Sequence, residues 1–256
     1  MRLNRVKRNI SAGGTAIGTM VFEFDTAGIA RIAAGAGADF VLFDMEHTGW
    51  SVETIRRLVA TCRPDGAVPF VRVPALEYHF VARVLDMGAM GIMVPMMESA
   101  EQAEKFVQIA KYPPVGRRGA AFGIAHDDYE GGDLREKIAT ANSETLLIAQ
   151  IETAAGLQHC EEIAAIPGID VLWIGQFDLT NSLGIPGQFD HPLFVEGVRH
   201  VVAACEQHGK VPGFMVTDVT SGRAMLAQGF RILAYSGDLW IYQAALGDGI
   251  RALRQG

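Results

Sequence analysis

Clusters of basic residues are almost absent from this sequence, which argues against nucleic-acid binding. The formal net charge is −7 over 256 residues, and the only basic cluster comprises Arg2, Arg5, Lys7 and Arg8. Nucleic-acid binders carry a basic face that neutralises phosphates. We therefore expect these four residues to form a flexible basic tip rather than a phosphate-binding arm.

Cysteine and long apolar runs are also scarce. Cys62, Cys160 and Cys205 are far apart and form no Cys-x-x-Cys pair, so buried free thiols are favoured over a zinc site or a disulfide. No apolar run approaches the ~20 residues that span a bilayer, and the N-terminus shows no signal-peptide core. These absences predict a soluble cytoplasmic protein.

The sequence does contain enough apolar material for one large core. Apolar residues make up 49% of the chain and charged residues 20%, so residues 1–256 are expected to form a single domain. Apolar positions recur at helical spacing after Ser51, after Ser99, over 157–164, after Pro192 and over 239–253. Between the helical patterns lie eight short, continuously apolar runs, at 15–21, 40–43, 69–73, 91–95, 146–151, 170–174, 211–215 and 230–234.

Continuous apolarity is typical of strands that are buried on both faces. Eight such strands alternating with helices predict an α/β fold, a TIM (β/α)8 barrel. Gly37, Gly88, Gly168 and Gly229 precede the second, fourth, sixth and eighth runs, where a glycine can end a helix. The segment 112–142 is rich in glycine and charge, and we expect a lid, an interface loop or disorder there.

Polar residues follow several of the predicted strands. Asp44 and His47 follow the second, Arg72 ends the third, Glu152 follows the fifth and Asp178 follows the sixth. In a TIM barrel the C-terminal strand ends meet at one rim, where active sites lie. The sequence therefore predicts that carboxylates, a base and a cation gather at this rim.

Each of these residues has a functional and a structural interpretation, and spacing alone leaves both open. Glu152 and Asp178 suit a hard cation such as Mg²⁺ or Mn²⁺, or they stabilise the helix starts that follow them. Asp44 either orients His47 as a base or bonds to the backbone beside an exposed histidine. Arg72 needs an anionic partner, which is a protein carboxylate or a substrate.

Five short motifs occur in order over nearly the whole chain, from about Gly18 to Ala234. They are Phe43-Asp44-Met45-Glu46-His47, Phe70-Val71-Arg72-Val73-Pro74, Tyr112-Pro113-Pro114-Val115-Gly116-Arg117-Arg118-Gly119, Gln150-Ile151-Glu152-Thr153 and Ile174-Gly175-Gln176-Phe177-Asp178-Leu179. Together they resemble the class II pyruvate aldolases of the citrate-lyase superfamily. That family includes 4-hydroxy-2-oxoheptanedioate aldolase and 2-dehydro-3-deoxyglucarate aldolase.

The resemblance implies a TIM barrel whose last helix packs on a neighbouring subunit, in a homo-oligomer that is a hexamer. It implies a divalent cation, Mg²⁺, Mn²⁺ or Co²⁺, held by Glu152 and Asp178. It also implies that His47 and Asp44 form a catalytic pair and that Arg72 lies at the ketone and enolate oxygen of the substrate.

Further residues take implied roles around the substrate. Gln150 corresponds to a residue near the metal-bound waters, and the backbone N–H groups of Phe177 and Asp178 to those that hold the pyruvate carboxylate. Ala120 and Met215 correspond to residues that line the aldehyde pocket.

The sequence also departs from the family pattern at two places. Gly175-Gln176-Phe177 stands where close relatives have Gly-Pro-Ala, so Phe177 is expected to narrow the pyruvyl pocket. The stretch 121–129 also differs, which leaves the acceptor aldehyde open.

The implied reaction is a metal-dependent, reversible cleavage of a 4-hydroxy-2-oxo acid into pyruvate, or a related 2-oxo acid, and an aldehyde. Oxaloacetate decarboxylation, or another enolate-forming lyase reaction, would use the same site. A lyase acting on an acyl-CoA ester would need a basic groove, and the sequence shows none. A non-catalytic metal-binding barrel is disfavoured because it would have no use for Asp44, His47, Arg72, Glu152 and Asp178 together.

Lysine is scarce, and this bears on how a ketone would be activated. The chain has only Lys7, Lys105, Lys111, Lys137 and Lys210. A Schiff-base aldolase needs a lysine that projects from a barrel strand into the apolar centre. None of the five lies in a predicted strand, so the sequence favours a metal over a Schiff base.

Overall fold

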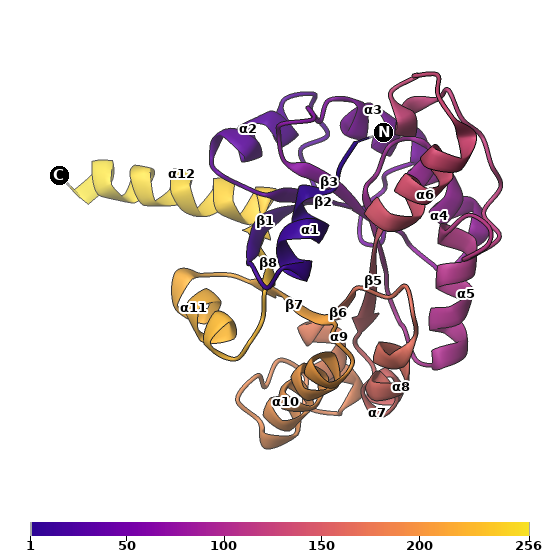
Figure 1. Cartoon of the computed structure of the whole chain (residues 1–256). Coiled ribbons are helices and arrows are strands. Elements are labelled where there is room, and N and C mark those ends of the chain that lie inside the picture. The colour runs from indigo at the N-terminus through magenta and orange to yellow at the C-terminus, as the bar shows by residue number, and fades with distance from the viewer. Residues whose placement is uncertain (1, 256) are drawn as a thin grey trace.

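The computed structural model describes residues 2–255, which form a closed barrel of eight parallel strands surrounded by helices (Figure 1). The strands are β1 (Ala16–Val21), β2 (Phe40–Asp44), β3 (Val68–Arg72), β4 (Gly91–Val94), β5 (Leu146–Ile151), β6 (Val171–Ile174), β7 (Val211–Val216) and β8 (Ile232–Gly237). Each strand pairs with the next, and β8 closes on β1 with Ile17 opposite Leu233. The predicted TIM barrel is confirmed.

Helices that follow the strands cover the outside of the barrel. They are α2 (Ile29–Gly35), α3 (Val52–Ala60), α4 (Tyr78–Asp86), α5 (Ala100–Ala110), α7 (Ala154–Gln158), α8 (Cys160–Ala165), α9 (Gln176–Ser182), α10 (Pro192–Gln207) and α11 (Val219–Ala227). Local sequence sets several of their starts. The side chains of Ser51 and Ser99 accept the N–H groups of Thr54 and Gln102, each at 3.2 Å, which caps α3 and α5.

The glycine repeat marks four turns from a helix toward a strand. Gly37, Gly88, Gly168 and Gly229 follow α2, α4, α8 and α11, and their φ angles are +95°, +100°, +101° and +96°. A side chain with a Cβ rarely adopts this left-handed conformation, whereas glycine does so at little cost. The repeat is therefore a backbone requirement of the recurring helix-to-strand connection.

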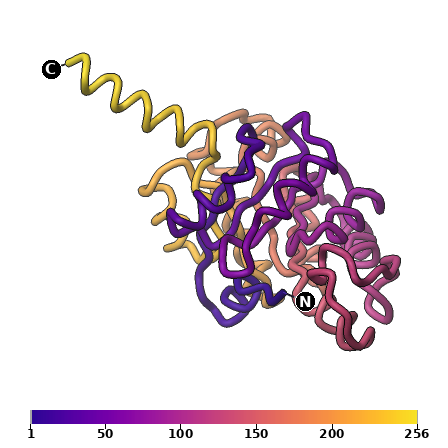
Figure 2. The backbone as a smooth tube through the Cα atoms, turned by 90° about the horizontal axis from the view of Figure 1, so that it is seen from above, coloured from indigo at the N-terminus to yellow at the C-terminus, as the bar shows by residue number. Residues whose placement is uncertain are grey.

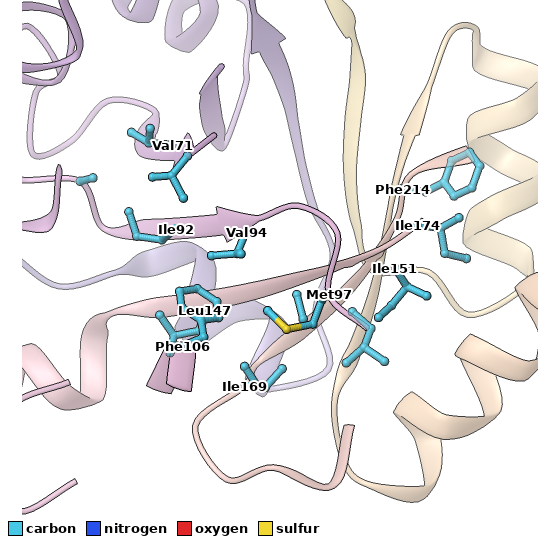
Figure 3. Packing of buried hydrophobic residues seen from close by; sticks show 14 of the residues in the cluster. Val71, Ile92, Val94, Met97, Phe106, Leu147, Ile151, Ile169, Ile174 and Phe214 are labelled. Atoms are coloured by element: carbon cyan, nitrogen blue, oxygen red, sulfur yellow. The ribbon is translucent and has the colours of Figure 1, made fainter. Parts of the chain in front are cut away.

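The apolar core has two layers, one inside the barrel and one between strands and helices. Inside, the rings of Phe40 and Phe70 stack with centroids 5.2 Å apart. The outer layer contains Val71, Ile92, Leu147 and Phe106 and is shown from close by in Figure 3. Because side chains fill the barrel interior, a ligand has room only at its rims. The outer layer also holds the three cysteines, which are buried free thiols as predicted.

The N-terminal segment is a helix rather than the flexible basic tip that its charges suggested. In α1 (Arg5–Ser11), Val6 and Ile10 are buried against the inner cluster. Arg8 pairs with Glu144 at 2.6 Å, and Arg2 pairs with Asp128 at 2.6 Å. The expectation was wrong because the partners of these cations lie more than 120 residues away along the chain.

The segment 112–142 is also more ordered than expected for a loop. It contains a 3₁₀ turn, η1 (Ala125–Asp127), and it runs into α6 (Leu134–Glu144). Lys137 on α6 pairs with the buried Asp127 at 2.6 Å. Only Lys137, Ala141 and Glu144 of α6 are buried, so the helix has hardly any apolar stripe by which its sequence could have revealed it.

The last helix, α12 (Asp238–Gln255), projects away from the barrel (Figures 1 and 2). It is anchored at its start, where the buried Asp238 carboxylate accepts the N–H groups of Phe22, Glu23 and Phe24. Beyond that turn its large apolar side chains are exposed: Trp240, Ile241, Tyr242, Leu246, Ile250 and Leu253. Among the described residues, no helix has both the length and the apolarity that crossing a membrane requires.

Candidate active site

A cavity of about 670 Å³ opens at the C-terminal rim of the barrel. Six residues singled out from the sequence line it: His47, Arg72, Gln150, Phe177, Asp178 and Met215. Glu152 is buried at the end of β5 and is only 1% exposed.

Ala120 is not among the residues that line this cavity, and its expected place in an aldehyde pocket stays a prediction. The chain leaves α5 at the end of the barrel remote from the cavity. The preceding residue, Gly119, donates its backbone N–H to the Tyr78 hydroxyl on the outer helix α4 at 2.8 Å. Ala120 is exposed on this outer loop.

Arg72 is fixed in the wall of the cavity by carboxylates. Asp44 and Arg72 are register partners on β2 and β3, and Arg72 Nε lies 2.5 Å from Asp44 Oδ1. Arg72 Nη1 lies 3.2 Å from Glu46 Oε2. A guanidinium that is paired in this way is held in one orientation, and it still faces the cavity. Arg72 therefore has a structural partner and is also available to a substrate.

His47 differs from the arrangement expected for an Asp44–His47 pair. Asp44 Oδ2 accepts the backbone N–H of His47 at 2.8 Å, and Oδ1 faces Arg72 and the N–H of Glu46. The imidazole ring is thus not held by Asp44 in the described chain. A carboxylate that ends a strand readily caps the following turn, and Asp44 does so here through the N–H groups of Glu46 and His47. The His47 side chain is 55% exposed at the cavity.

Glu46 belongs to this cluster, although the sequence reasoning gave it no role. Its Oε2 lies 3.8 Å from His47 Nε2 and 3.2 Å from Arg72 Nη1. Burial raises the pKa of Glu46 to about 7, and the Asp44 and Asp178 carboxylates also raise it, while Arg72 opposes them. The available signal was its position two residues beyond Asp44, because residues two apart share a face of extended chain.

Glu152 and Asp178, to which the resemblance assigns a cation, lie near enough for the Asp178 carboxylate to raise the pKa of Glu152. Glu152 Oε1 accepts the N–H of Met96 at 2.6 Å, and Oε2 accepts the side-chain amide of Gln150. Burial raises the pKa of Glu152 to about 7, and Glu46 and Asp178 add to that rise. A cation would relieve this accumulation of negative charge.

Two further observations fit a cation with water ligands. The Gln150 Oε1 atom is buried without a hydrogen-bond partner in the described chain, so an acceptor is left for a water or a ligand. A Cβ at Gly175 would overlap the Glu152 carboxylate, so glycine leaves the space that this carboxylate occupies. The described residues hold no cluster of three His, Cys, Asp or Glu side chains, and two carboxylates suit Mg²⁺, which keeps several waters.

Two lysines are buried, but neither lines the cavity. Lys111 donates to the carbonyl groups of Asn142 and Thr145, both at 2.7 Å, and burial lowers its pKa to about 7. Thr145 directly precedes β5, so Lys111 lies at the rim opposite the cavity. Lys137 is paired with Asp127. Lys111, whose lowered pKa would suit a Schiff-base nucleophile, therefore lies at the end of the barrel away from the cavity.

Phe177 is a partly exposed residue in the wall of the cavity. Its side chain is 56% exposed and packs edge-to-face on Phe189 at 5.3 Å. Phe177 and Met215 line the same cavity, and the expected narrowing of the pyruvyl pocket by Phe177 stays a prediction.

A closed (β/α)8 barrel with paired carboxylates, a fixed arginine and an accessible histidine at its C-terminal rim defines a TIM-barrel enzyme. The protein family described as HpcH/HpaI aldolase/citrate lyase matches residues 19–244. The chain belongs to this family, and it is a carbon–carbon lyase.

Similar proteins support the same assignment over nearly the full length. A hydroxypyruvate/pyruvate aldolase of Roseobacter denitrificans is 34% identical, over 93% of this chain and 92% of its own. A 2-keto-3-deoxy-L-rhamnonate aldolase of Klebsiella pneumoniae is 32% identical, over 95% and 90%. The crystal structure of an HpcH/HpaI aldolase from Desulfitobacterium hafniense superimposes with a TM-score of 0.93 at 33% identity, covering 98% of this chain and 97% of that one.

Proposed function

We propose that this enzyme catalyses the reversible aldol cleavage of a 4-hydroxy-2-oxo acid to pyruvate, or a related 2-oxo acid, and an aldehyde. The observation that carries the proposal is the meeting of Arg72, His47, Gln150 and Asp178 around one cavity, next to the buried Glu152. The relatives named as pyruvate and deoxyrhamnonate aldolases support this reaction class.

The chemistry divides among residues of the chain. His47 accepts the proton of the 4-hydroxyl group. The electrons of that O–H bond form the aldehyde carbonyl as the C3–C4 bond breaks, and the bond electrons become the enolate of the 2-oxo acid. Arg72 stabilises the enolate oxygen by its positive charge. Protonation of the enolate at C3, with His47 returning the proton, gives the 2-oxo acid.

Glu152 and Asp178 would hold a divalent cation, Mg²⁺, Mn²⁺ or Co²⁺, with Gln150 beside its waters. A cation bound there would supply Lewis-acid stabilisation of developing negative charge. The N–H groups of Phe177 and Asp178 are proposed to orient the carboxylate of the 2-oxo acid.

The role of Arg72 is tested by a half-reaction that needs no aldehyde. Arg72→Ala is expected to slow exchange of the pyruvate C3 protons by at least ~10²-fold, the usual worth of one group that stabilises an oxyanion. Exchange is followed by NMR in deuterated water. Arg72→Lys retains a positive charge beside Asp44, and it serves as a second variant in case Arg72→Ala does not fold.

The matched control is Arg57→Ala, which removes an exposed arginine that pairs with Asp25 on the outside of the barrel. It should leave exchange unchanged. Proton exchange at the wild-type rate in folded Arg72→Ala would show that Arg72 has only a structural role.

We further propose that α12 packs on a neighbouring subunit in a hexamer. Its exposed apolar face would otherwise remain in water. Burying apolar surface contributes a free energy of roughly 25 cal/mol per Å². Light scattering after gel filtration should therefore give an oligomer at micromolar concentration. Leu246→Asp should shift the protein to smaller species, whereas Gln243→Glu on the same helix should not. A monomeric wild type would contradict the proposal.

A further inference from the structure

We propose that the aldehyde handled by this cavity is uncharged and has an aromatic or other apolar body, and that it does not carry a second carboxylate or a phosphate. The inference rests on the proposed function, because it names the class of aldehyde for that same site. It is carried by the aromatic lining of the cavity and by the signs of the charges around it.

Aromatic side chains are concentrated in the wall of this cavity. Aromatic residues make up only 8% of the chain, yet all three of its tryptophans and two phenylalanines line the cavity. These residues are Phe22, Trp50, Trp173, Phe177 and Trp240. Aromatic rings offer large apolar surfaces on which another ring or an alkyl chain packs. The part of a substrate that reaches them is therefore stabilised most when it is apolar.

Two of the rings form a fixed wall that begins beside Arg72. The centroid of the Phe22 ring lies 5.9 Å from Arg72 Cζ, and Trp240 packs edge-to-face on Phe22 with centroids 5.1 Å apart. Asp238 Oδ1 accepts the backbone N–H of Phe22 at 2.9 Å. A Cβ at Gly237 would lie 2.9 Å from atoms of both rings, so glycine leaves the space that this pair needs. A substrate whose enolate oxygen faces Arg72 thus has this wall directly beside it.

Two further rings of the lining are held by neighbouring residues. Trp173 on β6 is only 3% exposed, and a Cβ at Gly213 on β7 would overlap its ring. Phe177 packs edge-to-face on Phe189 at 5.3 Å. Rings that are fixed in this way keep their shape when a ligand arrives, so little conformational entropy is lost on binding.

The charges of the cavity disfavour an acidic aldehyde. Arg72 is the one arginine or lysine among the described residues that line the cavity, and the proposed reaction uses it at the enolate oxygen. The lining also contains the carboxylates of Glu23 and Asp178. A carboxylate or phosphate on the aldehyde would need a cation as its partner. It would instead meet Glu23, which directly follows Phe22 in the aromatic wall.

The test compares three aldehydes of the form X–CH₂–CH₂–CHO, in which X is methyl (butanal), carboxylate (4-oxobutanoate) or phenyl (3-phenylpropanal). The magnesium-loaded full-length protein adds each of them to pyruvate, and kcat/KM is measured. We expect 3-phenylpropanal to exceed butanal by about tenfold, because even one methylene in an apolar pocket changes kcat/KM by ~10–200-fold. We expect 4-oxobutanoate to fall at least ~10-fold below butanal, since like charges placed together are disfavoured.

Substitutions separate the aromatic contact from the charge. Trp240→Ala should lower the preference for 3-phenylpropanal over butanal by about fivefold, and Trp240→Phe, which keeps a ring, should retain most of it. Glu23→Gln should raise kcat/KM for 4-oxobutanoate relative to butanal by about threefold. The matched controls are Leu226→Ala and Glu53→Gln, which change exposed residues on the outer helices α11 and α3. They should alter neither ratio.

Binding without turnover keeps this inference separate from the proposed function. The acids 2-oxoheptanoate, 2-oxoheptanedioate and 6-phenyl-2-oxohexanoate carry the same three groups X, and they cannot be cleaved because they lack the 4-hydroxyl group. All three tryptophans line the cavity, so binding can be titrated by intrinsic fluorescence. The phenyl acid should bind most tightly and the dicarboxylic acid most weakly.

Equal affinities for the three acids, or a preference for the carboxylate member in binding or in turnover, would overturn the inference. The second result would show that a cation from elsewhere reaches the aldehyde end of the cavity. The expected order of affinities without turnover of any of the three aldehydes would count against the proposed function and would leave the inference about the cavity standing.

Discussion

Removing the divalent cation with a chelator is expected to lower aldol cleavage by at least ~10³-fold, since Lewis-acid stabilisation of an enolate is worth several kcal/mol. Adding back Mg²⁺, Mn²⁺ or Co²⁺ should restore the activity. The physical reason is that the described residues lining the cavity include one arginine and no lysine, so Arg72 is the one permanently charged cation of the chain near the developing negative charge. The measurement is pyruvate release from a 4-hydroxy-2-oxo acid.

Borohydride added with pyruvate is the matched control, because it traps a Schiff base and does not affect a metal site. It should leave activity intact. Full activity in the presence of chelator, or a pyruvyl–lysine adduct found by mass spectrometry, would overturn the proposed mechanism.

The affinity for the cation should also depend on pH in a defined direction. In the metal-free protein the pKa of Glu152 is raised to about 7, so a proton competes with the cation for this carboxylate below that pH. Apparent affinity, measured by calorimetry, should therefore fall as the pH decreases from 7 to 5. An affinity independent of pH over this range would indicate that Glu152 is not a ligand.

His47→Ala is expected to lower kcat by about 10²–10⁴-fold, the usual contribution of a positioned general base. The KM for the 2-oxo acid should change less, because Arg72 and the carboxylate pair are untouched. The measurement is steady-state kinetics of cleavage in the magnesium-loaded enzyme.

His200→Ala is the control, since His200 is exposed on α10 and should leave both constants unchanged. A His47→Ala variant that cleaves its substrate at the wild-type rate would assign the base to another group. Glu46, whose pKa is raised to about 7, would then be the first residue to test.

The apolar pattern of the sequence predicted the barrel because each strand produces its own part of that pattern. Strands that are covered on both faces must be continuously apolar, so the eight runs matched β1–β8 to within a few residues. The same pattern placed Arg72, Glu152 and Asp178 at one rim, since all parallel strands end on the same side of the barrel. Where an element has little apolar stripe, as in α6, or derives its order from distant ion pairs, as at Arg2 and Arg8, the pattern could not predict it.

The sequence by itself thus determined the fold, the rim that carries the polar residues and the family resemblance. Only the tertiary structure decided which groups contact one another. The β2–β3 register sets Asp44 opposite Arg72. In the turn after β2, the second carboxylate oxygen of Asp44 accepts the backbone N–H of His47. The carboxylate that lies near the His47 ring is that of Glu46. Contacts of this kind depend on register and side-chain direction to within about 1 Å, and no spacing along a chain specifies distances so finely.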